Sequence, residues 1–207
     1  MGNTFRTNGD TVTAETLQIP GYIAGTWDID PVHSHVGFVA RHLAIAKVRG
    51  RFTRFEGQVI TARDPLRSSA TAMIDATSLE TGHEQRNSDV KGENFLDVAS
   101  YPTLTYRSTG VRRRGRTGIV VDGELTVRGI AHPVELTAEV NGFGPDPYGQ
   151  TRVGLSATGE VSRCAYGLRA DGVLPSGSLV IGEKIQLTIE VEASLTSGLR
   201  QRTGHNA

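Results

Sequence analysis

Alternation of apolar and polar residues is the feature of this sequence that most constrains its fold. From Ile185 to Ala193 every odd-numbered residue is apolar and every even-numbered residue is polar. The segments 121–127, 134–140 and 153–161 repeat this pattern. A period of two is typical of antiparallel strands that have one buried and one solvated face. Such strands must bury their apolar faces together, either by closing into a barrel or by stacking as two sheets.

Further segments are compatible with strands, and turn signals separate them. Strands are also expected at Thr26–Asp30, Ser34–His42, Ala46–Ile60, Ala70–Leu79 and Thr103–Val111. Turns are expected at Arg114-Gly115, Arg128-Gly129, Gly142–Pro145, Asp146–Gly149 and Gly182-Glu183. Eight or nine strands with one buried face predict an all-β fold with one or two short helices. The expected form is a closed antiparallel eight-stranded β-barrel, with two stacked sheets as the alternative that the strand pattern leaves open.

One segment departs from the period of two and is expected to form a short helix. Thr81-Gly82-His83-Glu84 fits a capping box, with Thr81 at the N-cap and Glu84 three residues later. The polar residues 85–91 favour a helix that ends near Gly92 and lies on the barrel surface or across its mouth. A second irregular piece, Cys164–Gly177, is expected to cross between the last two strands.

The length of 207 residues is enough for one barrel domain without disulfide bonds. We expect a flexible N-terminal segment at 1–21, a single barrel at 22–195 and a flexible tail at 196–207. No stretch approaches the ~18 apolar residues of a membrane-spanning helix, and the first residues lack the pattern of a signal peptide. The single cysteine, Cys164, cannot form an internal disulfide and is expected to be inert. These features predict a soluble cytoplasmic protein.

The charges of the chain balance, with 22 Lys and Arg against 22 Asp and Glu. Phosphate neutralisation supplies most of the affinity of a nucleic-acid binder, which therefore has a positive excess. Zero net charge argues against a nucleic-acid partner and against attachment to anionic membranes by overall charge. The strongest local cluster, Arg112–Arg116, is expected to be a solvated hairpin tip, with docking to anionic lipid as the alternative.

The inward-facing residues of the regular strands are small. Glycine contributes 25 residues to the chain, and aromatic residues only 6%. Gly123, Ala138 and Ala157 lie mid-strand on the apolar side, and the alternating alanines of 70–76 form another small column. Because protein interiors are close-packed, this pattern predicts an apolar cavity suited to a long flexible hydrocarbon. The alternative is that loops or large side chains from the less regular strands fill the volume.

The segment Gly25–Leu43 closely resembles the opening signature of the YceI-like family. The similarity covers about 25–193 and continues, in order, through Lys47–Phe52, Thr81–Arg86, Phe95–Val98, Tyr101–Thr103, Gly123–Gly129 and His132–Val134. Members of this family are polyisoprenoid-binding proteins with a lipocalin-like barrel. The resemblance implies a barrel that holds a long isoprenoid chain, such as a quinone tail or a polyprenyl phosphate, for storage or transport. Gly25-Thr26-Trp27 is also similar to the Gly-x-Trp start of lipocalins, which implies that Trp27 closes one barrel end.

The expected ligand-binding residues are inward side chains of several strands, with polar groups at the ends of one strand. In the segment 34–42, Ser34 and His42 lie at the two ends of the apolar column. A polar group at an apolar mouth can orient a head group, and Arg41 is placed to meet an anionic one. The full expected set is Ser34, Val36, Phe38, Ala40, Arg41, His42, Ala72, Ile74, Leu125, Leu136, Leu155, Ala157 and Leu187.

Two other functions remain open from the sequence. His33 and His35 share one side of a strand, a spacing that metal ligands use, and His42, His83 or His132 would complete the site of a metal-dependent enzyme. By parity, however, both histidines point outward or lie at the frayed start of the strand. We therefore expect no enzyme, metal or cofactor, and no catalytic motif is recognised. The other alternative is a stress-response protein whose barrel is packed solid, and exposed strand edges near the helix favour a homodimer.

Overall fold

The computed structural model describes residues 17, 19–115, 118–169 and 180–198, and strands dominate these residues. The strands are β1 (Gly25–Ile29), β2 (His35–His42), β3 (Ala46–Phe52), β4 (Phe55–Thr61), β5 (Ser69–Asp75), β6 (Leu79–Glu80), β7 (Thr103–Arg114), β8 (Gly118–Val127), β9 (Ile130–Pro145), β10 (Thr151–Ser162) and β11 (Ile181–Gly198). The helices are α1 (Glu84–Lys91) and the 3₁₀ helices η1 (Pro65–Arg67), η2 (Ala76–Ser78) and η3 (Arg163–Tyr166). Most of the segments expected to be flexible, 1–16 and 199–207, lie outside the described residues.

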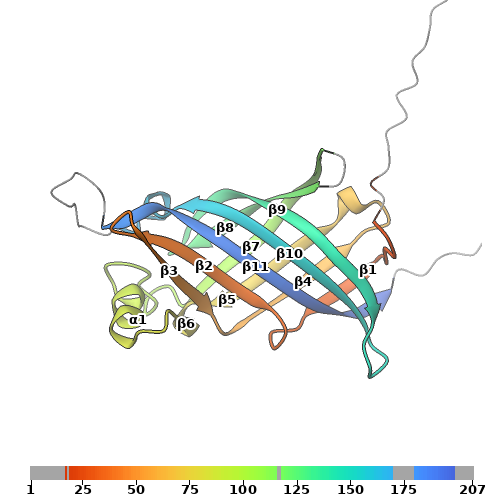
Figure 1. Ribbon diagram of the computed structural model, residues 1–207, viewed down its shortest axis with the longest axis horizontal. Coiled ribbons are helices and arrows are strands. Elements are labelled where there is room, and N and C mark those ends of the chain that lie inside the picture. Colours follow the sequence, from red (N-terminus) through yellow and green to blue (C-terminus); the bar gives the residue numbers. More distant parts are fainter. Residues whose placement is uncertain (1–16, 18, 116–117, 170–179, 199–207) are drawn as a thin grey trace, which may run out of the picture.

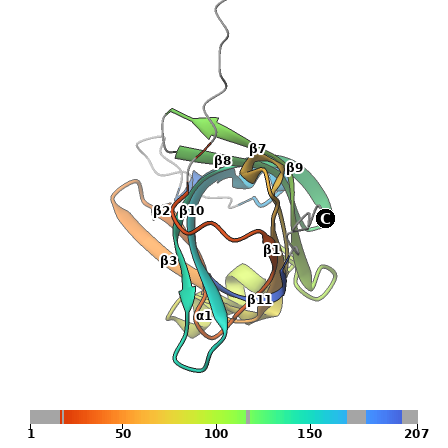
Figure 2. The ribbon, with the colours of Figure 1, turned by 90° about the vertical axis from the view of Figure 1, so that its right-hand side faces the viewer.

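The strands close into a barrel. The order of hydrogen-bonded neighbours is β1-β4-β5-β7-β8-β9-β10-β11, and β11 also pairs with β1, which completes the ring. All of these pairs are antiparallel. Figure 2 looks along the barrel and shows the segment that precedes β1 running across its end. The predicted closed eight-stranded antiparallel barrel is thus confirmed.

In two places around the barrel, two strands that are consecutive in the sequence follow one another, one after the other. Both β1 and β2 pair with β11: β1 pairs with its later part, where Ile29 lies opposite Ala193, and β2 with its earlier part, where His35 lies opposite Glu190. The strands β3 and β4 likewise succeed one another after a break at Thr53 and Arg54. The single strand expected at Ala46–Ile60 is therefore wrong in one detail, because the chain turns a corner at its middle.

Ser78 is the residue that makes this corner. Its hydroxyl accepts hydrogen bonds from the backbone N–H of Thr53 at 3.1 Å and of Arg54 at 3.0 Å. The Asp75 carboxylate caps η2 by accepting from the backbone N–H of Thr77 at 2.8 Å. These local bonds compete with strand pairing. They therefore also break the strand expected at Ala70–Leu79 into β5, η2 and β6.

The tight turn between β8 and β9 confirms one expected hairpin. Arg128 and Gly129 have φ values of 52° and 72°. Two consecutive residues in the left-handed region form a two-residue turn whose twist matches that of the flanking strands. The turn at Asp146–Gly149 is also confirmed, because the Asp146 carboxylate accepts from the backbone N–H groups of Tyr148 and Gln150 at 2.9 and 2.8 Å.

Two expected turns are wrong. Gly142–Pro145 belongs to β9, and Gly182-Glu183 belongs to β11. In both places the register shifts against the neighbouring strand, so the irregular sequence is absorbed by a bulge rather than by a reversal. The last strand continues to Gly198, beyond the expected end of the barrel at Leu195.

The helix α1 forms where the sequence predicts it, but its cap differs. The N-cap is His83, whose ring nitrogen Nδ1 accepts from the backbone N–H of Arg86 at 3.4 Å. The hydroxyl of Thr81 instead contacts the Asn87 side chain at 2.7 Å. The predicted capping box is therefore wrong, because the N-cap lies two residues after Thr81. Gly92 is the C-cap, as expected.

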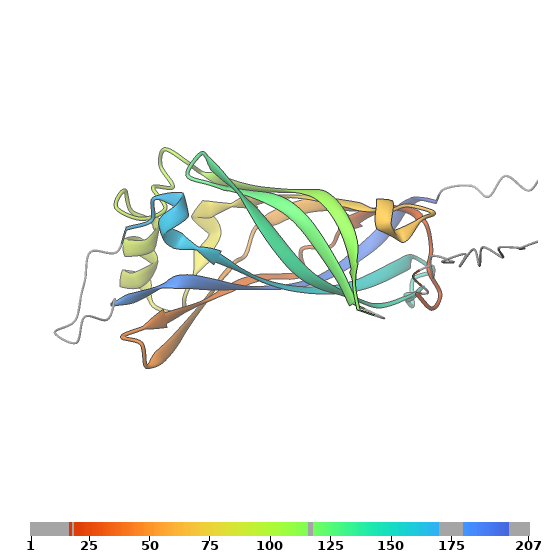
Figure 3. The same ribbon diagram turned by 90° about the horizontal axis from the view of Figure 1, so that it is seen from above.

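Two buried clusters lie toward opposite ends of the barrel. The larger one is at the end near α1, the left-hand end in Figure 1, and includes Leu79, Leu96 and Tyr166. The smaller one surrounds Trp27, Val153 and Ala193 at the end where β1 lies. Figure 3 shows α1 and η3 together at the first end. The elements that break the β pattern therefore cover one end of the barrel.

Candidate ligand-binding cavity

An internal cavity of about 250 Å³ lies inside the barrel. Its wall is built from residues of every described strand except β6, together with residues that precede β1 and residues in and near η1. Most of the lining side chains are aliphatic or aromatic. The regular columns of the sequence supply much of this wall, including Val121, Val134, Ala138, Ile189 and Val191. The predicted apolar cavity is present, and a barrel packed solid is not what the structure has.

Nine of the thirteen expected ligand-binding residues line this cavity. They are Val36, Phe38, Ala72, Ile74, Leu125, Leu136, Leu155, Ala157 and Leu187. Their strands bring them together because inward positions recur every second residue along each strand. Contact with a ligand stays a prediction for all nine.

The other four expected residues are not among those that line the cavity. The Ser34 hydroxyl donates to the backbone carbonyl of Glu192 at 3.1 Å and accepts from its N–H at 3.0 Å. It thus replaces strand pairing where the chain passes from β1 to β2, and it is not placed to meet a head group. Ala40, Arg41 and His42 end β2 near its turn into β3. The inward column of β2 extends past the cavity, so parity alone misplaced Ala40 and His42, whereas Arg41 lies on the outer column.

Part of the volume expected to be empty is filled by aromatic rings from neighbouring strands. A Cβ atom at Gly50 would lie 2.2 Å from the Phe38 ring, and one at Gly123 would lie 2.5 Å from the Tyr106 ring. These glycines accommodate rings rather than leaving space for a guest. The cavity that remains is lined by alanines such as Ala72. The interior therefore contains the predicted cavity, and large side chains also fill part of the volume, as the alternative supposed.

Tyr106 is a cavity residue that the sequence reasoning missed. Its hydroxyl is buried and has no hydrogen-bond partner among the described residues. Burial raises the pKa of Tyr106 to about 12, and the nearby Asp122 carboxylate adds to the shift. Buried hydroxyls nearly always have a partner, so this one stands out. Its position on the inward parity of 103–111, together with Leu104, was the available signal.

Polar groups of the cavity gather at the end where β4 finishes. There the Tyr22 hydroxyl donates to the backbone carbonyl of Ala62 at 2.7 Å and lies 3.2 Å from the Ser68 hydroxyl. Thr61 lies at the same end and accepts from the Trp27 indole N–H at 2.7 Å. Tyr22 belongs to the segment that crosses the barrel end, as does Ile19, which also lines the cavity. Three hydroxyl groups of the cavity wall, those of Tyr22, Thr61 and Ser68, are thus gathered at this end.

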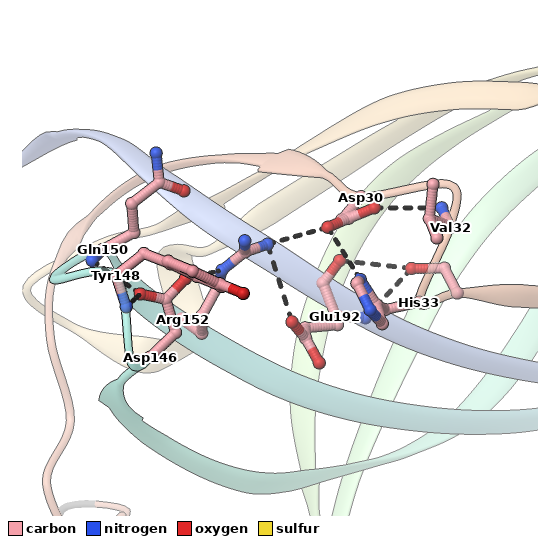
Figure 4. Close-up of polar contacts among 9 residues, drawn as sticks. Asp30, Val32, His33, Asp146, Tyr148, Gln150, Arg152 and Glu192 are labelled. Atoms are coloured by element: carbon pink, nitrogen blue, oxygen red, sulfur yellow. Dashed lines mark hydrogen bonds and ion pairs between the residues drawn. The ribbon is translucent and has the colours of Figure 1, made fainter.

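A group of charged side chains joins β1, β10 and β11 near the turn after β1 (Figure 4). The Arg152 guanidinium contacts Asp30 at 2.8 Å, Asp146 at 3.0 Å and Glu192 at 3.5 Å. His33 Nδ1 lies 3.0 Å from the Asp30 carboxylate. We call these five residues the Arg152 cluster.

The Arg152 cluster bears on the metal alternative. Asp30, His33 and Glu192 offer ligand atoms within 4.8 Å of one another. His33 is therefore grouped with two carboxylates, and not with His35 as the sequence alternative supposed. The Arg152 guanidinium is already within ion-pair distance of both carboxylates and would repel a divalent cation. The geometry favours a group of ion pairs that links neighbouring strands over a metal centre.

The contact between Asp30 and His33 shifts both pKa values. The hydrogen bond from His33, aided by Arg152, lowers the pKa of Asp30 from 3.8 to about 2. The same hydrogen bond raises the pKa of His33 above its ordinary value of 6.5. The contribution of Asp30 to stability is complete above pH 3.8 and is lost as the pH falls to about 2. That of His33 is complete below pH 6.5 and is lost as the pH rises through its raised pKa.

We expect Asp30→Asn to return the pKa of His33 toward 6.5, because the amide removes the negative charge that favours the imidazolium. Titration of the His33 ring protons by NMR measures this shift. Asp28→Asn is the matched control, since Asp28 lies two residues earlier, on β1, and accepts a hydrogen bond from Gln58 instead. A His33 pKa that is the same in wild type and in Asp30→Asn would show that the contact is absent in solution.

The remaining candidates from the sequence are accounted for by local contacts. The arginine run ends at the hairpin turn between β7 and β8 as expected, with Arg114 opposite Gly118. Its first member, Arg112, pairs with Asp122 and Glu135 at 2.8 Å each. Arg116 lies outside the described residues. Cys164 is an exposed thiol in η3. Trp27 is fully buried. Among the described residues no helix is long and apolar enough to cross a membrane.

The chain is similar to known proteins over most of its length. Residues 27–193 match the family described as the YceI-like domain. A UPF0312 protein of Vibrio cholerae serotype O1 is 30% identical over 148 residues, which are 70% of this chain and 77% of that protein. A UPF0312 protein of Photorhabdus laumondii is 31% identical over 166 residues, or 79% of this chain and 86% of that protein.

Solved structures share the barrel. BcnA of Burkholderia cenocepacia superposes with a TM-score of 0.69 at 22% identity, over 79% of this chain and 98% of that chain. A polyisoprenoid binding domain from Saccharophagus degradans superposes with a TM-score of 0.62 at 18% identity, over 84% of this chain and 99% of that chain. At these identities the likeness shows a common fold.

Proposed function

Because this chain belongs to the YceI-like domain family, we propose that it binds the long apolar chain of an isoprenoid or a similar lipid inside its barrel. The observation that carries the proposal is the internal cavity of about 250 Å³ with its wall of apolar side chains. Each CH₂ group that moves from water into such a wall contributes about 0.8 kcal/mol. The polyisoprenoid binding domain that shares this fold adds support.

The size and lining of the cavity favour a slender guest. Sites for compact drug-sized ligands usually measure about 300–1,000 Å³, and this cavity is smaller. Its length follows the barrel strands, from Phe38 and Leu104 to Tyr22 and Pro65. A single flexible hydrocarbon chain fits such a space better than a fused ring system does.

We place the head group of the lipid at the end that contains Tyr22, Thr61 and Ser68. This end carries the hydroxyl groups of these three residues, whereas the opposite end is filled by a buried cluster that includes Leu79 and Leu96. A lipid would therefore enter with its apolar tail first. The head group, of the quinone or polyprenyl phosphate type, would stay near the segment that crosses the barrel end.

The role that follows is storage or transport of the lipid without chemical change. The wall of the cavity offers mainly hydrocarbon, and the charged residues of the Arg152 cluster are held by one another. The cytoplasmic location and the homodimer expected from the sequence stay predictions.

Mass spectrometry of solvent extracts from natively purified protein tests the proposal. We expect an isoprenoid or other long-chain lipid in near-stoichiometric amount, absent from extracts of the same protein purified after unfolding. A second arm adds a quinone or a polyprenyl phosphate to the delipidated, refolded protein and measures binding by native mass spectrometry. A clean extract together with no binding of either lipid would overturn the proposal.

A further inference from the structure

The hairpin of β2 and β3 presents an apolar tip to solvent. Its turn consists of Leu43, Ala44 and Ile45, followed by Ala46, the first residue of β3. Ala44, Ile45 and Ala46 are exposed, and Ile45 is 84% exposed. Figures 2 and 3 show this hairpin projecting from the body of the barrel. We call the four residues 43–46 the hairpin tip.

The backbone of the hairpin tip is strained, and the side chains there are unusual for such a turn. Leu43 and Ala44 have φ values of 54° and 61°. Left-handed turns of this kind strongly prefer Asn, Asp or Gly, and the chain uses Arg128-Gly129 for the corresponding turn between β8 and β9. Residues with larger side chains are disfavoured in this region. Solvent exposure alone gives no reason for apolar residues in this turn.

Uncompensated positive charge flanks the hairpin tip. Arg41 and Lys47 are cross-strand partners, and Arg49 is two residues further on the same face of β3. That face is the outer one, because Phe38 and Phe52, on the opposite parity, line the cavity. Among the described residues none of these three cations has an ion-pair partner, whereas Arg51 is neutralised by Glu80 at 3.0 Å. The segment 35–52 contains no acidic residue.

A hollow of about 440 Å³ lies beside these cations. His35, Val39, Arg49 and Thr188 contribute to its wall, as does the ion pair of Arg51 and Glu80. An exposed apolar tip with Arg41, Lys47 and Arg49 behind it matches the layers of a membrane surface. In a bilayer, apolar groups lie beneath the phosphates, and polybasic segments gain about 1 kcal/mol per cation near an anionic surface.

We propose that the hairpin tip docks on lipid bilayers that contain anionic phospholipids. Leu43, Ala44 and Ile45 insert among the lipids at the level of the head groups, and Arg41, Lys47 and Arg49 contact the phosphates. The zero net charge of the whole chain does not reveal this local surface, because the segment 35–52 contains cations and no acidic residue. The docking surface is separate from the cavity and gives a lipid carrier a place to meet its source.

Vesicle co-sedimentation of the full chain tests the docking. We expect binding to vesicles of mixed phosphatidylglycerol and phosphatidylcholine, little binding to pure phosphatidylcholine, and weakening by salt. Lys47→Gln together with Arg49→Gln should weaken binding about 25-fold, since each lost cation costs about fivefold. Ile45→Asp should weaken it at least as much. Arg67→Gln and Tyr148→Ser, whose exposed side chains lie toward the opposite end, are the matched controls.

A fluorescent variant reports the insertion directly. Trp27 is the sole tryptophan and is fully buried, so its emission should not respond to vesicles. Ile45→Trp adds an exposed tryptophan at the hairpin tip, and we expect its emission to shift to the blue with anionic vesicles. Circular dichroism checks the fold of each variant, and the lipid content of each, measured by extraction, reads the cavity independently.

The proposal is overturned by either of two results. One is no binding of the wild-type chain to anionic vesicles and no shift of the Ile45→Trp emission. The other is binding that Ile45→Asp and the double Gln variant reduce no more than the two controls do. Neither result affects the lipid content of the cavity, so failure of the docking surface is distinct from failure of the proposed lipid binding.

Discussion

Replacing Ala157 by tryptophan is expected to remove the bound lipid almost completely while the barrel remains folded. Ala157 lines the cavity from β10, and its cross-strand partner Ala138 lines it from β9. An indole at this place would occupy space inside the barrel that the lipid chain needs. We expect the lipid recovered per protein to fall at least tenfold in mass spectrometry of solvent extracts. Overpacking costs about 1–3 kcal/mol in a filled core, and the free volume keeps the cost at the lower end.

Thr158→Trp is the matched control for this experiment. Thr158 is the next residue along β10, is exposed, and lies on the opposite face of the strand from Ala157. The same side chain added outside the barrel should leave the lipid content unchanged. If Ala157→Trp is folded and carries as much lipid as Thr158→Trp, the lipid does not lie in the cavity.

Replacing Trp27 by alanine is expected to lower the free energy of unfolding by about 3–5 kcal/mol, the usual cost of a large aromatic residue lost from a core. Trp27 is fully buried against Val153 and Ala193, and its ring centroid lies 5.5 Å from that of Phe143. The indole N–H also donates to the Thr61 hydroxyl at 2.7 Å. Since domains are stable by about 5–15 kcal/mol in total, the variant should be close to unfolding.

Urea unfolding followed by circular dichroism measures the effect of Trp27→Ala. The midpoint should fall markedly, and Trp27→Phe should lie between the variant and wild type, because the ring remains and the hydrogen bond is lost. Tyr148→Ala is the control for loss of an aromatic side chain, since Tyr148 is 92% exposed. An unchanged midpoint in Trp27→Ala would mean that the barrel end does not depend on this residue.

The strands and the cavity could be predicted because they follow from a local rule. Each inward position is followed by another two residues later, so Leu155 and Ala157 were placed correctly without knowledge of their neighbours. The rule does not predict cavity residues correctly where a strand is interrupted or where it extends beyond the end of the cavity. Ser34 has the same parity as the inward residues of β2, yet its hydroxyl forms hydrogen bonds with the backbone of Glu192. His42 also has the inward parity, but it lies near the turn into β3, beyond the end of the cavity.

Contacts between residues far apart in the sequence account for what was missed. The Phe38 ring covers Gly50, and the Tyr106 ring covers Gly123, so large residues on one strand fill the space left by small residues on another. Arg152 and Asp30 are separated by 122 positions but touch at 2.8 Å. No local pattern connects such pairs, because the strand order and register that join them arise only when the barrel closes.

By itself, the sequence determined the all-β class, the antiparallel strands, the inward side of each regular strand and a hydrocarbon-lined interior. The physical reason is that a strand buries one face at a fixed period, whatever its partners are. The tertiary structure alone decided how much of that interior is empty, which end is polar, and which charges remain unpaired. Arg51 and Arg49 look alike in the sequence, yet only Arg51 meets an acidic partner, Glu80. Packing and charge compensation are properties of pairs, and pairs exist only in the folded chain.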